Sequence, residues 1–541
     1  MRSGNHGVLD VLIRGGWVVD GTGNPSYPAD VALEDGRIAE VGRIHEGATA
    51  NRVIDASGKI VCPGFVDPHS HSDFTVLTNP TAESTIRQGV TTEVVGNCGW
   101  SYAPVTDFSA AMMLGRLRTF AYEGPLEWST TGEFLDFVGR GGHSQNLAWF
   151  VGHNAVRLAA GVSGSAPSEE ELGVMEGFVR EAMDAGALGM STGLEFEPGR
   201  GAPTEELIQL NSVAGEYEGA IHSSHIRNRD ANLLRSIDEF LEIARIGGTK
   251  AEISHLNVRH NTGAPDRGWE RAVEMMAESR EHGLDVLADT TPLRDGLGQM
   301  AAILPPWVME GGAQEAAARL RQPGVRKRLR GECDRYWRFI HKGEWDRVRL
   351  QGSREFPGLE GKTFPEIARV LGKDEWECFF DILAAEGAAL ESALMVGRLF
   401  TDEHLAEMIG HPLFCLGVDT FTSTTDGPLS QVTKHPLAYS GHVHYLTHHV
   451  RELGTLRLED AIRKMTSMPA VHFGLQDRGF LRSGYAADVV VFDFDELADV
   501  STDEQPLAYA RGVEHVLVNG ALVVEDGQHT GARPGMQLLR T

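Results

Sequence analysis

The pattern of apolar and polar positions gives the chain two β-rich ends and a middle of a different kind. Near the N-terminus, short apolar runs such as Val8–Leu12 and Ile38–Val41 alternate with Asp-Gly and Ser-Gly turns. The tail shows the same pattern in Ala487–Phe492, His515–Val518 and Ala521–Val524. Both ends of the chain therefore predict short strands joined by tight turns.

Between Pro63 and Gly474, short apolar runs alternate with longer segments of helical periodicity. Leu147–Val151 and Phe414–Val418 have the length and composition of buried strands, whereas Glu169–Ala185 carries apolar residues at helical spacing. Strands that alternate with helices form parallel βαβ units, and this many units predict an α/β fold with a (β/α)₈ barrel of the TIM type.

A polar, arginine-rich stretch from Glu315 to Gln351 interrupts the alternation. We expect a helical insertion there, at about 305–355, in a barrel loop where it could serve as a lid. The predicted organisation is then an N-terminal β-part at 1–62, the barrel at 63–475 and a C-terminal β-part at 476–541.

Composition narrows the partners of this chain. Its 541 residues are 41% hydrophobic and 23% charged, as in folded proteins, and the net charge of −27 disfavours nucleic acid and anionic membranes as partners. The N-terminal residues lack the apolar core of a signal peptide, and no segment approaches the roughly 18 apolar residues of a membrane span. The five cysteines are odd in number and scattered, which predicts a reducing, cytoplasmic location and at most one functional thiolate.

Residues that commonly bind metals follow the predicted strands. An isolated His-x-His is a weak signal, and a single buried cysteine or strand-end aspartate is explained by packing or helix capping. In a barrel, however, the carboxyl ends of the strands meet at one mouth. The set therefore predicts a binuclear site with zinc-type ligands. Its members, in chain order, are His69, His71, Cys98, His225, His255 and Asp419.

Longer motifs occur in the order seen in a known family. They are GFVDPHSHSD, VVGNCG, GALGMSTGLEFEPG, SSHIRNR, ISHLN and a tail that runs from IRKMTSMPA to GARPG. On these motifs the chain resembles the amidohydrolase superfamily and, within it, the N-acyl-D-amino-acid deacylase (D-aminoacylase) family. The resemblance covers essentially the whole chain. It implies that both termini build one small β-sandwich domain beside the barrel.

The resemblance also implies roles for the metal-ligand candidates. It places one metal at His69 and His71, the other at Cys98, His225 and His255, and assigns metal contact and proton transfer to Asp419. Many superfamily members bridge two metals with a carboxylated lysine, but Gly186–Gly193 contains no lysine. In the resembling family, a cysteine is the ligand that replaces this bridging lysine. We therefore expect one tightly bound Zn²⁺ at Cys98 and a weaker second site.

Several positions depart from the family pattern that grips the substrate carboxylate. Asn257 stands where the family has a lysine, Thr291 and Leu293 stand where it has tyrosines, and Leu437 replaces an arginine. Losing a charged hydrogen bond costs roughly 1.5–3 kcal/mol. We therefore expect a small-molecule substrate without a free acid beside the scissile bond, with Asn257 and Thr291 among the substrate-binding residues.

An arginine elsewhere could replace the missing lysine. The candidates are Arg227, Arg259 and Arg294, and the last two are explained more simply by surface ion pairing. Arg227 lies two residues after His225 and matches an arginine common in the family. We therefore predict Arg227 as a substrate-binding residue.

Two other classes of function compete with a metal-dependent hydrolase. Gly189–Gly193 fits the G-x-S-x-G pattern of a serine hydrolase around Ser191, but the residues that follow are typical of a loop rather than the required helix. A catalytically silent barrel would lose ligands, and none is missing here. Asp426 is the local alternative to Asp419, which directly ends an apolar run.

The sequence thus predicts a zinc-dependent amidohydrolase that cleaves a non-peptide amide bond of a small N-acyl compound. A neutral amide, a cyclic imide, a lactone or an ester is the alternative substrate for the same site. The stereochemistry, the number of bound metals and the presence of a homo-oligomer stay open at this point.

Overall fold

Eight parallel strands form the centre of the molecule. The computed structural model describes residues 8–162, 166–334, 336–503 and 505–540. The sheet order is β16-β12-β11-β10-β9-β8-β7-β6. The strands are β6 Phe65–Asp67, β7 Val90–Val95, β8 Asn146–Gly152, β9 Gly189–Gly193, β10 Ile221–His225, β11 Lys250–Ile253, β12 Val286–Thr290 and β16 Phe414–Leu416. A bridge from Ser70 to Thr420 joins the first strand to the last, so the sheet closes into a barrel. The predicted (β/α)₈ barrel is confirmed.

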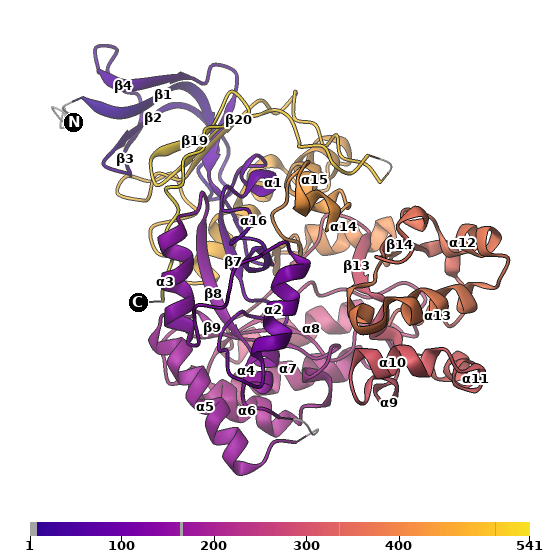
Figure 1. Ribbon diagram of the computed structural model, residues 1–541. Helices are drawn as coiled ribbons and strands as arrows, with labels where there is room; N and C mark the ends of the chain where they lie inside the picture. The colour runs from indigo at the N-terminus through magenta and orange to yellow at the C-terminus, as the bar shows by residue number, and fades with distance from the viewer. Residues whose placement is uncertain (1–7, 163–165, 335, 504, 541) are drawn as a thin grey trace.

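Helices cover the outside of this barrel (Figure 1). Almost every barrel-strand residue is buried, as expected for parallel strands covered on both faces. Ser168 caps α5 through a capping box with Glu171, and the helix buries Met175 and Val179 against the barrel. The helices are α1 Glu83–Ile86, α2 Ala110–Thr119, α3 Thr131–Gly141, α4 His153–Ala159, α5 Glu169–Asp184, α6 Thr204–Gly215, α7 Leu233–Gly247, α8 Gly268–Glu281, α14 Asp402–Gly410, α15 Leu437–His444, α16 Leu458–Met465 and α17 Ser467–His472.

The two ends of the chain form one mixed sheet beside the barrel. Its order is β20-β19-β18-β17-β5-β1-β2-β3, with β4 paired to β1. The strands are β1 Leu9–Val18, β2 Tyr27–Glu34, β3 Arg37–Gly42, β4 Ala50–Asp55, β5 Ile60–Pro63, β17 Val489–Phe492, β18 Val513–Val518, β19 Ala521–Glu525 and β20 Gln528–His529. Antiparallel pairing of β17 with β5 joins the C-terminal part to the N-terminal part. The predicted small β-domain built from both termini is confirmed.

Between β12 and β16 the chain leaves the barrel and forms a separate lobe, residues 295–398, which we call the insertion lobe (Figure 1). Its antiparallel sheet has the order β13-β15-β14, with β13 Asp295–Gln299, β14 Val348–Gly352 and β15 Leu394–Arg398. Its helices are α9 Pro306–Met309, α10 Ala313–Leu320, α11 Pro323–Glu332, α12 Phe364–Leu371 and α13 Glu375–Glu386. The helical segment expected at 305–355 lies inside this longer excursion.

The sheet of the insertion lobe was not predicted from the sequence. The strand β13 reads DGLGQ, which has no alternation of apolar and polar residues, and its partner β15 lies about a hundred residues later. Within the described ranges, no helix combines the length and apolar character needed to cross a bilayer.

Candidate metal centre and active site

The six predicted metal-ligand residues converge at the mouth of the barrel. Each lies at or just beyond the carboxyl end of a barrel strand: His69 and His71 after β6, Cys98 after β7, His225 at the end of β10, His255 after β11 and Asp419 after β16. Their ligand atoms form two groups that share Cys98, and the atoms of each group lie within 4.8 Å of one another. The alternative residue Asp426 is exposed and belongs to neither group.

Cys98 lies at the centre of the cluster. Its Sγ is 3.4 Å from His69 Nε2, 3.8 Å from His225 Nδ1 and 3.6 Å from His255 Nε2. Tetrahedral zinc binds nitrogen and sulfur at about 2.0–2.3 Å, which places the ligand atoms about 3.3–3.8 Å from one another. The observed spacing therefore suits a metal ion held between the thiolate and the imidazoles.

Asp419 reaches histidines of both groups. Its Oδ1 is 3.3 Å from His71 Nε2 and 3.4 Å from His69 Nε2, and its Oδ2 is 3.8 Å from His255 Nε2. About a third of its side chain, 31%, is exposed, so the carboxylate faces the cavity above the cluster. The geometry allows Asp419 to contact both a metal and a substrate.

Buried carboxylates orient two of the imidazoles. Asp289 Oδ2 lies 2.9 Å from His69 Nδ1, and Glu195 Oε2 lies 2.7 Å from His225 Nε2. A carboxylate on one ring nitrogen holds the proton there and leaves the lone pair on the other nitrogen. In each ring the nitrogen that faces Cys98 is the one left free. Carboxylate–histidine pairs of this kind are typical of metal sites.

The backbone of the cluster is strained. Cys98, His255 and Asp419 have positive φ angles of 52°, 36° and 55°, although none of them is glycine. A residue held in this region costs of order 1–3 kcal/mol, and such residues collect at functional sites. The fold therefore holds three of the six residues in conformations that their side chains disfavour.

Burial controls the protonation of the cluster. It raises the pKa of the Cys98 thiol well above its usual value, and the nearby Asp419 raises it further. Burial, together with Arg229, lowers the pKa of His225 to about 4, so this imidazole is neutral at pH 7. Burial also acts to raise the pKa of Asp419, but His69 and its neighbours more than offset this, so the pKa lies below its usual value. The neutral imidazole of His225 and the carboxylate of Asp419 are ready to bind metal, whereas the thiol of Cys98 must first lose its proton.

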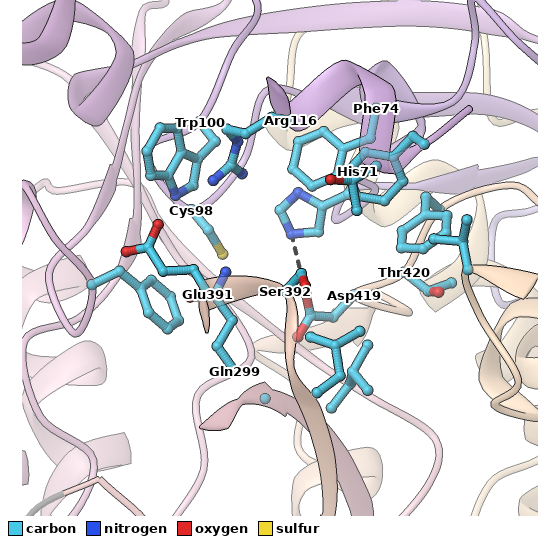
Figure 2. Close-up of a pocket in the computed structure, with 18 of the residues that line it drawn as sticks. His71, Phe74, Cys98, Trp100, Arg116, Gln299, Glu391, Ser392, Asp419 and Thr420 are labelled. Atoms are coloured by element: carbon cyan, nitrogen blue, oxygen red, sulfur yellow. Dashed lines mark ion pairs between the residues drawn. The ribbon is translucent and has the colours of Figure 1, made fainter. Parts of the chain in front are cut away.

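A cavity of about 580 Å³ opens above the cluster. Figure 2 shows His71, Cys98 and Asp419 directed into the same space, with Gln299 and Glu391 of the insertion lobe also lining it. The volume lies within the range of small-molecule sites. Aromatic rings make up much of the wall: Phe74, Trp100, Phe120, Phe196, Tyr336 and Phe421. The cavity therefore combines an apolar wall with a polar, metal-ligating floor.

Comparison with known proteins gives the family. The sequence profile of the Amidohydrolase family matches residues 52–207 and 339–524. The chain belongs to this family. The predictions of an amidohydrolase of the D-aminoacylase family, and of a hydrolase that acts on carbon–nitrogen bonds other than peptide bonds, are confirmed.

Similar proteins match along their full length. The chain is 34% identical to the N-acyl-D-glutamate deacylase of Alcaligenes xylosoxydans xylosoxydans, over 98% of this chain and 97% of the relative. It is 30% identical to the D-aminoacylase of the same organism, over 98% of each chain. A solved structure of N-acyl-D-glutamate deacylase from Bordetella bronchiseptica, complexed with zinc and a phosphonate inhibitor, matches with a TM-score of 0.80 and 31% identity, over 98% of this chain and 100% of that one. A divalent metal in this amidohydrolase is supported.

The three predicted substrate-binding residues do not line the cavity. Arg227, Asn257 and Thr291 all lie in the described part of the chain, but none of them belongs to the cavity wall. The Asn257 amide donates to the carbonyl of His255, and the Thr291 hydroxyl donates to the carbonyl of Leu293. Because these side chains bond to the backbone of their own turns, the geometry gives no support to their predicted contact with substrate.

Each of the three arginines that could replace the missing lysine forms an ion pair with a carboxylate. Arg227 also donates to the carbonyls of Arg200 and Ala202, which fixes its guanidinium outside the cavity. The ion pairs are Arg227 with Glu239, Arg259 with Glu195 and Arg294 with Asp402. None of these arginines has a free charge to offer a substrate.

Ser191 has a structural place in the amidohydrolase. The GMSTG segment forms the whole of β9 and does not turn into a helix. The Ser191 hydroxyl accepts a hydrogen bond from the Gly99 backbone N–H, 3.0 Å away, and donates to the carbonyl of Gly96. Ser191 therefore anchors the loop that carries Cys98, and the serine-hydrolase interpretation has no support from its surroundings.

Two charged residues of the site, Arg229 and Glu195, were not predicted from the sequence. Arg229 lines the cavity, and its guanidinium lies 2.8 Å from His255 Nδ1 and 3.1 Å from His225 Nε2. Glu195 accepts a hydrogen bond from Arg229 at 3.3 Å. Burial acts to raise the pKa of Glu195, but the guanidiniums of Arg259 and Arg229 hold it well below the usual value. A signal was present, because Arg229 belongs to the SSHIRNR motif and Glu195 follows the end of β9.

Proposed function

We propose that this amidohydrolase cleaves the amide bond of a small N-acyl compound and uses zinc to do so, as an enzyme similar to the N-acyl-D-amino-acid deacylases. The observation that carries the proposal is the pair of ligand groups that share Cys98 on the floor of the cavity. Relatives named as N-acyl-D-glutamate deacylase and D-aminoacylase, similar over almost their whole length, support the same substrate class.

The donor set suits zinc. A thiolate and imidazoles are ligands that zinc accepts readily, whereas magnesium and calcium prefer oxygen. We propose that the tighter site uses Cys98, His225 and His255, and that a weaker site uses His69 and His71 with Asp419. When bound, zinc would supply Lewis acidity, which polarises the scissile carbonyl and makes water acidic enough to ionise near pH 7.

Asp419 is the proposed proton carrier. Its lowered pKa keeps it a carboxylate at neutral pH, and its partial exposure lets it reach a water in the cavity. We propose that it accepts a proton from the attacking water and delivers it to the leaving nitrogen, which is the usual sequence of general base and then general acid. Asp289 and Glu195 hold the imidazoles of His69 and His225 in place while the proton moves.

The second candidate is an uncharged substrate on the same site: a neutral amide, a cyclic imide, a lactone or an ester. It is favoured by Asn257 and Thr291, which replace the carboxylate-binding positions of the resembling family and bond only to the backbone. A carboxylate beside the scissile bond would be left without a partner there, and burying an unpaired charge is strongly unfavourable.

Metal analysis and a hydrolysis screen test the proposal. We expect the purified protein to carry about one equivalent of zinc at its tight site. A chelator should abolish turnover and zinc should restore it. The screen covers N-acyl-D-amino acids, their amides, cyclic imides and lactones. Active protein without any transition metal would refute the mechanism.

A matched pair of variants sharpens this test. Cys98→Ala should lose both bound zinc and turnover. Cys415→Ala should keep both, because Cys415 is also buried in the barrel but belongs to neither ligand group, and its thiol donates to the carbonyl of Ala288. If the two variants bind zinc equally well, Cys98 is not a ligand.

A further inference from the structure

Arg116 is a cation in the cavity wall that forms no ion pair with a carboxylate in the part of the chain that the structure describes. It lies on α2 and lines the cavity together with His71 and Asp419. Its side chain is only half-buried, yet none of the aspartates and glutamates in the described ranges forms an ion pair with it. Its charge acts on Asp73 and on the hydroxyl of Tyr102, both buried beside it, without a salt bridge.

Aromatic stacking orients the Arg116 guanidinium. Its central carbon lies 3.8 Å from the centre of the Trp100 ring and 5.6 Å from that of Phe74. Figure 2 shows the guanidinium between these two side chains. Stacking occupies the face of the guanidinium, so the N–H groups in its plane are left for hydrogen bonds, and the Tyr102 hydroxyl lies within reach of one of them. Those groups match the two oxygens of a carboxylate, which arginine binds in a bidentate manner.

The other cations of the cavity are less suited to a ligand. Arg229 is buried and already paired with Glu195, and Arg354 is exposed to solvent. Arg116 is the arginine of this wall that is both shielded by rings and free of a carboxylate partner.

The phenyl ring of Phe74 lies between Arg116 and the predicted metal-ligand residue His71. Phe74 stacks on His71 at 5.0 Å between ring centres, and Arg116 contacts the same phenyl ring. A negatively charged group bound at Arg116 therefore lies several bonds away from a scissile amide held at the cluster. This position differs from those of Asn257 and Thr291, which do not line the cavity and bond to the backbone of their own turns.

The insertion lobe places one opposing charge in the same cavity. Glu391, in the short 3₁₀ segment Gly387–Ser392, lines the cavity and is influenced by the charge of Arg116, but the two do not form an ion pair. An anionic ligand at Arg116 would be attracted by the arginine and repelled by this glutamate. The two residues should therefore affect a charged substrate in opposite directions.

We propose that Arg116 is a specificity-determining residue, which binds a carboxylate of the substrate at a distance from the scissile amide. The inference rests on the proposed amide hydrolysis and narrows its substrate class. The substrate is then an N-acyl compound with an uncharged group beside the scissile bond and an acidic group farther away, on either the amine or the acyl side.

Two matched substrate pairs test the assignment on the zinc-loaded enzyme. N-acetyl-D-glutamic acid α-amide and N-acetyl-D-glutamine α-amide differ only by a carboxylate on the amine side. N-succinyl-D-alanine amide and N-succinamoyl-D-alanine amide differ in the same way on the acyl side. We expect the charged member of at least one pair to have the larger kcat/KM, by about 10-fold or more, as for a charged hydrogen bond.

Four variants separate recognition from structure. Arg116→Met should lower kcat/KM for the charged substrate by about 10- to 100-fold and change the neutral one by less than about 3-fold. The kcat/KM of Arg116→Lys for the charged substrate should fall between those of the wild type and Arg116→Met, because lysine keeps the charge but loses the paired N–H groups that bind both carboxylate oxygens. Glu391→Gln should raise kcat/KM for the charged substrate. Arg118→Ala is the control, since Arg118 lies on the exposed face of α2 and pairs with Glu123.

The outcomes distinguish this inference from the proposed function. If the wild type hydrolyses the substrates but Arg116→Met affects both members of each pair equally, Arg116 has only a structural role and the inference is wrong. A preference for the neutral member in both pairs has the same consequence. If the zinc-loaded wild type hydrolyses no member of either pair, in D or L form, the proposed function fails and the inference fails with it.

Discussion

Asp419 combines a strained backbone with two carboxylate oxygens that reach different histidines. Its φ of 55° is a conformation that asparagine adopts more readily than most residues. Asparagine also keeps the size of the side chain while removing its charge and its capacity to accept a proton. Asp419→Asn is therefore a better probe of proton transfer than alanine, which would add backbone strain to the loss of the carboxylate.

We expect Asp419→Asn to lower kcat by at least about 10²-fold, the lower range for a general base, while the tight metal site keeps its metal. Asp426→Asn is the control, because Asp426 is a nearby exposed aspartate outside both ligand groups. Steady-state kinetics and metal analysis of both variants provide the measurement. Normal turnover of Asp419→Asn would assign the proton transfer to another group.

Asp289 is the second residue whose substitution tests the site, because it should affect metal binding without being a predicted ligand. Its Oδ2 contacts His69 Nδ1 and its Oδ1 accepts from the backbone N–H of His255 at 3.0 Å. In Asp289→Asn, one of these donors would meet an amide NH₂ instead of an oxygen. We expect metal affinity to fall by about 10- to 100-fold, as when other partners of ligating histidines are removed.

Competition with a chromophoric chelator measures this affinity without any need for turnover. Asp402→Asn serves as the control, since Asp402 pairs with Arg294 on the surface and lies outside the ligand groups. Equal zinc affinity in the wild type and Asp289→Asn would show that His69 needs no orientation by Asp289.

At the scale of elements, β9 and the loop after β7 depend on each other. The Ser191 hydroxyl satisfies the N–H of Gly99 and the carbonyl of Gly96 on both sides of Cys98. Ser191→Ala leaves two buried backbone groups without a partner, which costs about 1–3 kcal/mol. We expect a lower midpoint of thermal unfolding together with a kcat close to that of the wild type.

A serine nucleophile would give the reverse result, with unfolding unchanged and kcat lost. Thr192→Ser is a control on the same strand, since serine keeps the hydroxyl through which Thr192 bonds to Ser224. Calorimetry and steady-state kinetics on the two variants separate the alternatives.

The sequence predicted those elements whose position follows from the general geometry of a barrel. His69, Cys98 and Asp419 were identifiable because each follows an apolar strand and the carboxyl ends of parallel strands meet. Neither the positive φ of Cys98 nor that of Asp419 has a signal in the sequence, because any residue type can be forced into this region by its surroundings.

Side chains outside the strand ends could not be placed in the same way. Arg227 follows a ligand histidine, yet it forms an ion pair with Glu239 on α7. The sequence does not show which face of α7 lies against Arg227. Arg116 lies on α2, away from any strand end, and its place in the cavity depends on how that helix packs. Such contacts are set by tertiary structure rather than by local pattern.

At the scale of the whole molecule, the barrel closes where its last strand meets its first. Helix α16 packs against both β6 and β16 at this seam. From α16 the ammonium of Lys464 donates to the carbonyls of Phe414, 2.8 Å away, and His411, 2.5 Å away. Lys464 is only 4% exposed, so the closure of the barrel places a cation in a buried site, and no carboxylate among the described residues is bonded to it.

This burial lowers the pKa of Lys464 to about 8, from a usual value of about 10.5. Below pH 8 the folded and unfolded chains are both protonated, and the folded chain bears the full cost of the buried charge. Between about pH 8 and 10.5 the folded chain loses the proton while the unfolded chain keeps it, so this residue contributes a rise in stability with pH. The rise amounts to about 3 kcal/mol at most.

We therefore expect Lys464→Met to remove this rise, because methionine fills a similar volume and does not titrate. The measurement is the urea midpoint of unfolding at several pH values from 7 to about 10.5, for the wild type and the variant. Their difference should grow in favour of the wild type as the pH rises through 8, since other titrating groups contribute equally to both curves. Lys327→Met, at an exposed position, should follow the wild type throughout. Parallel curves for the wild type and Lys464→Met would mean that the lysine keeps its usual pKa in the folded protein, and that its hydrogen bonds to the two carbonyls compensate for its burial.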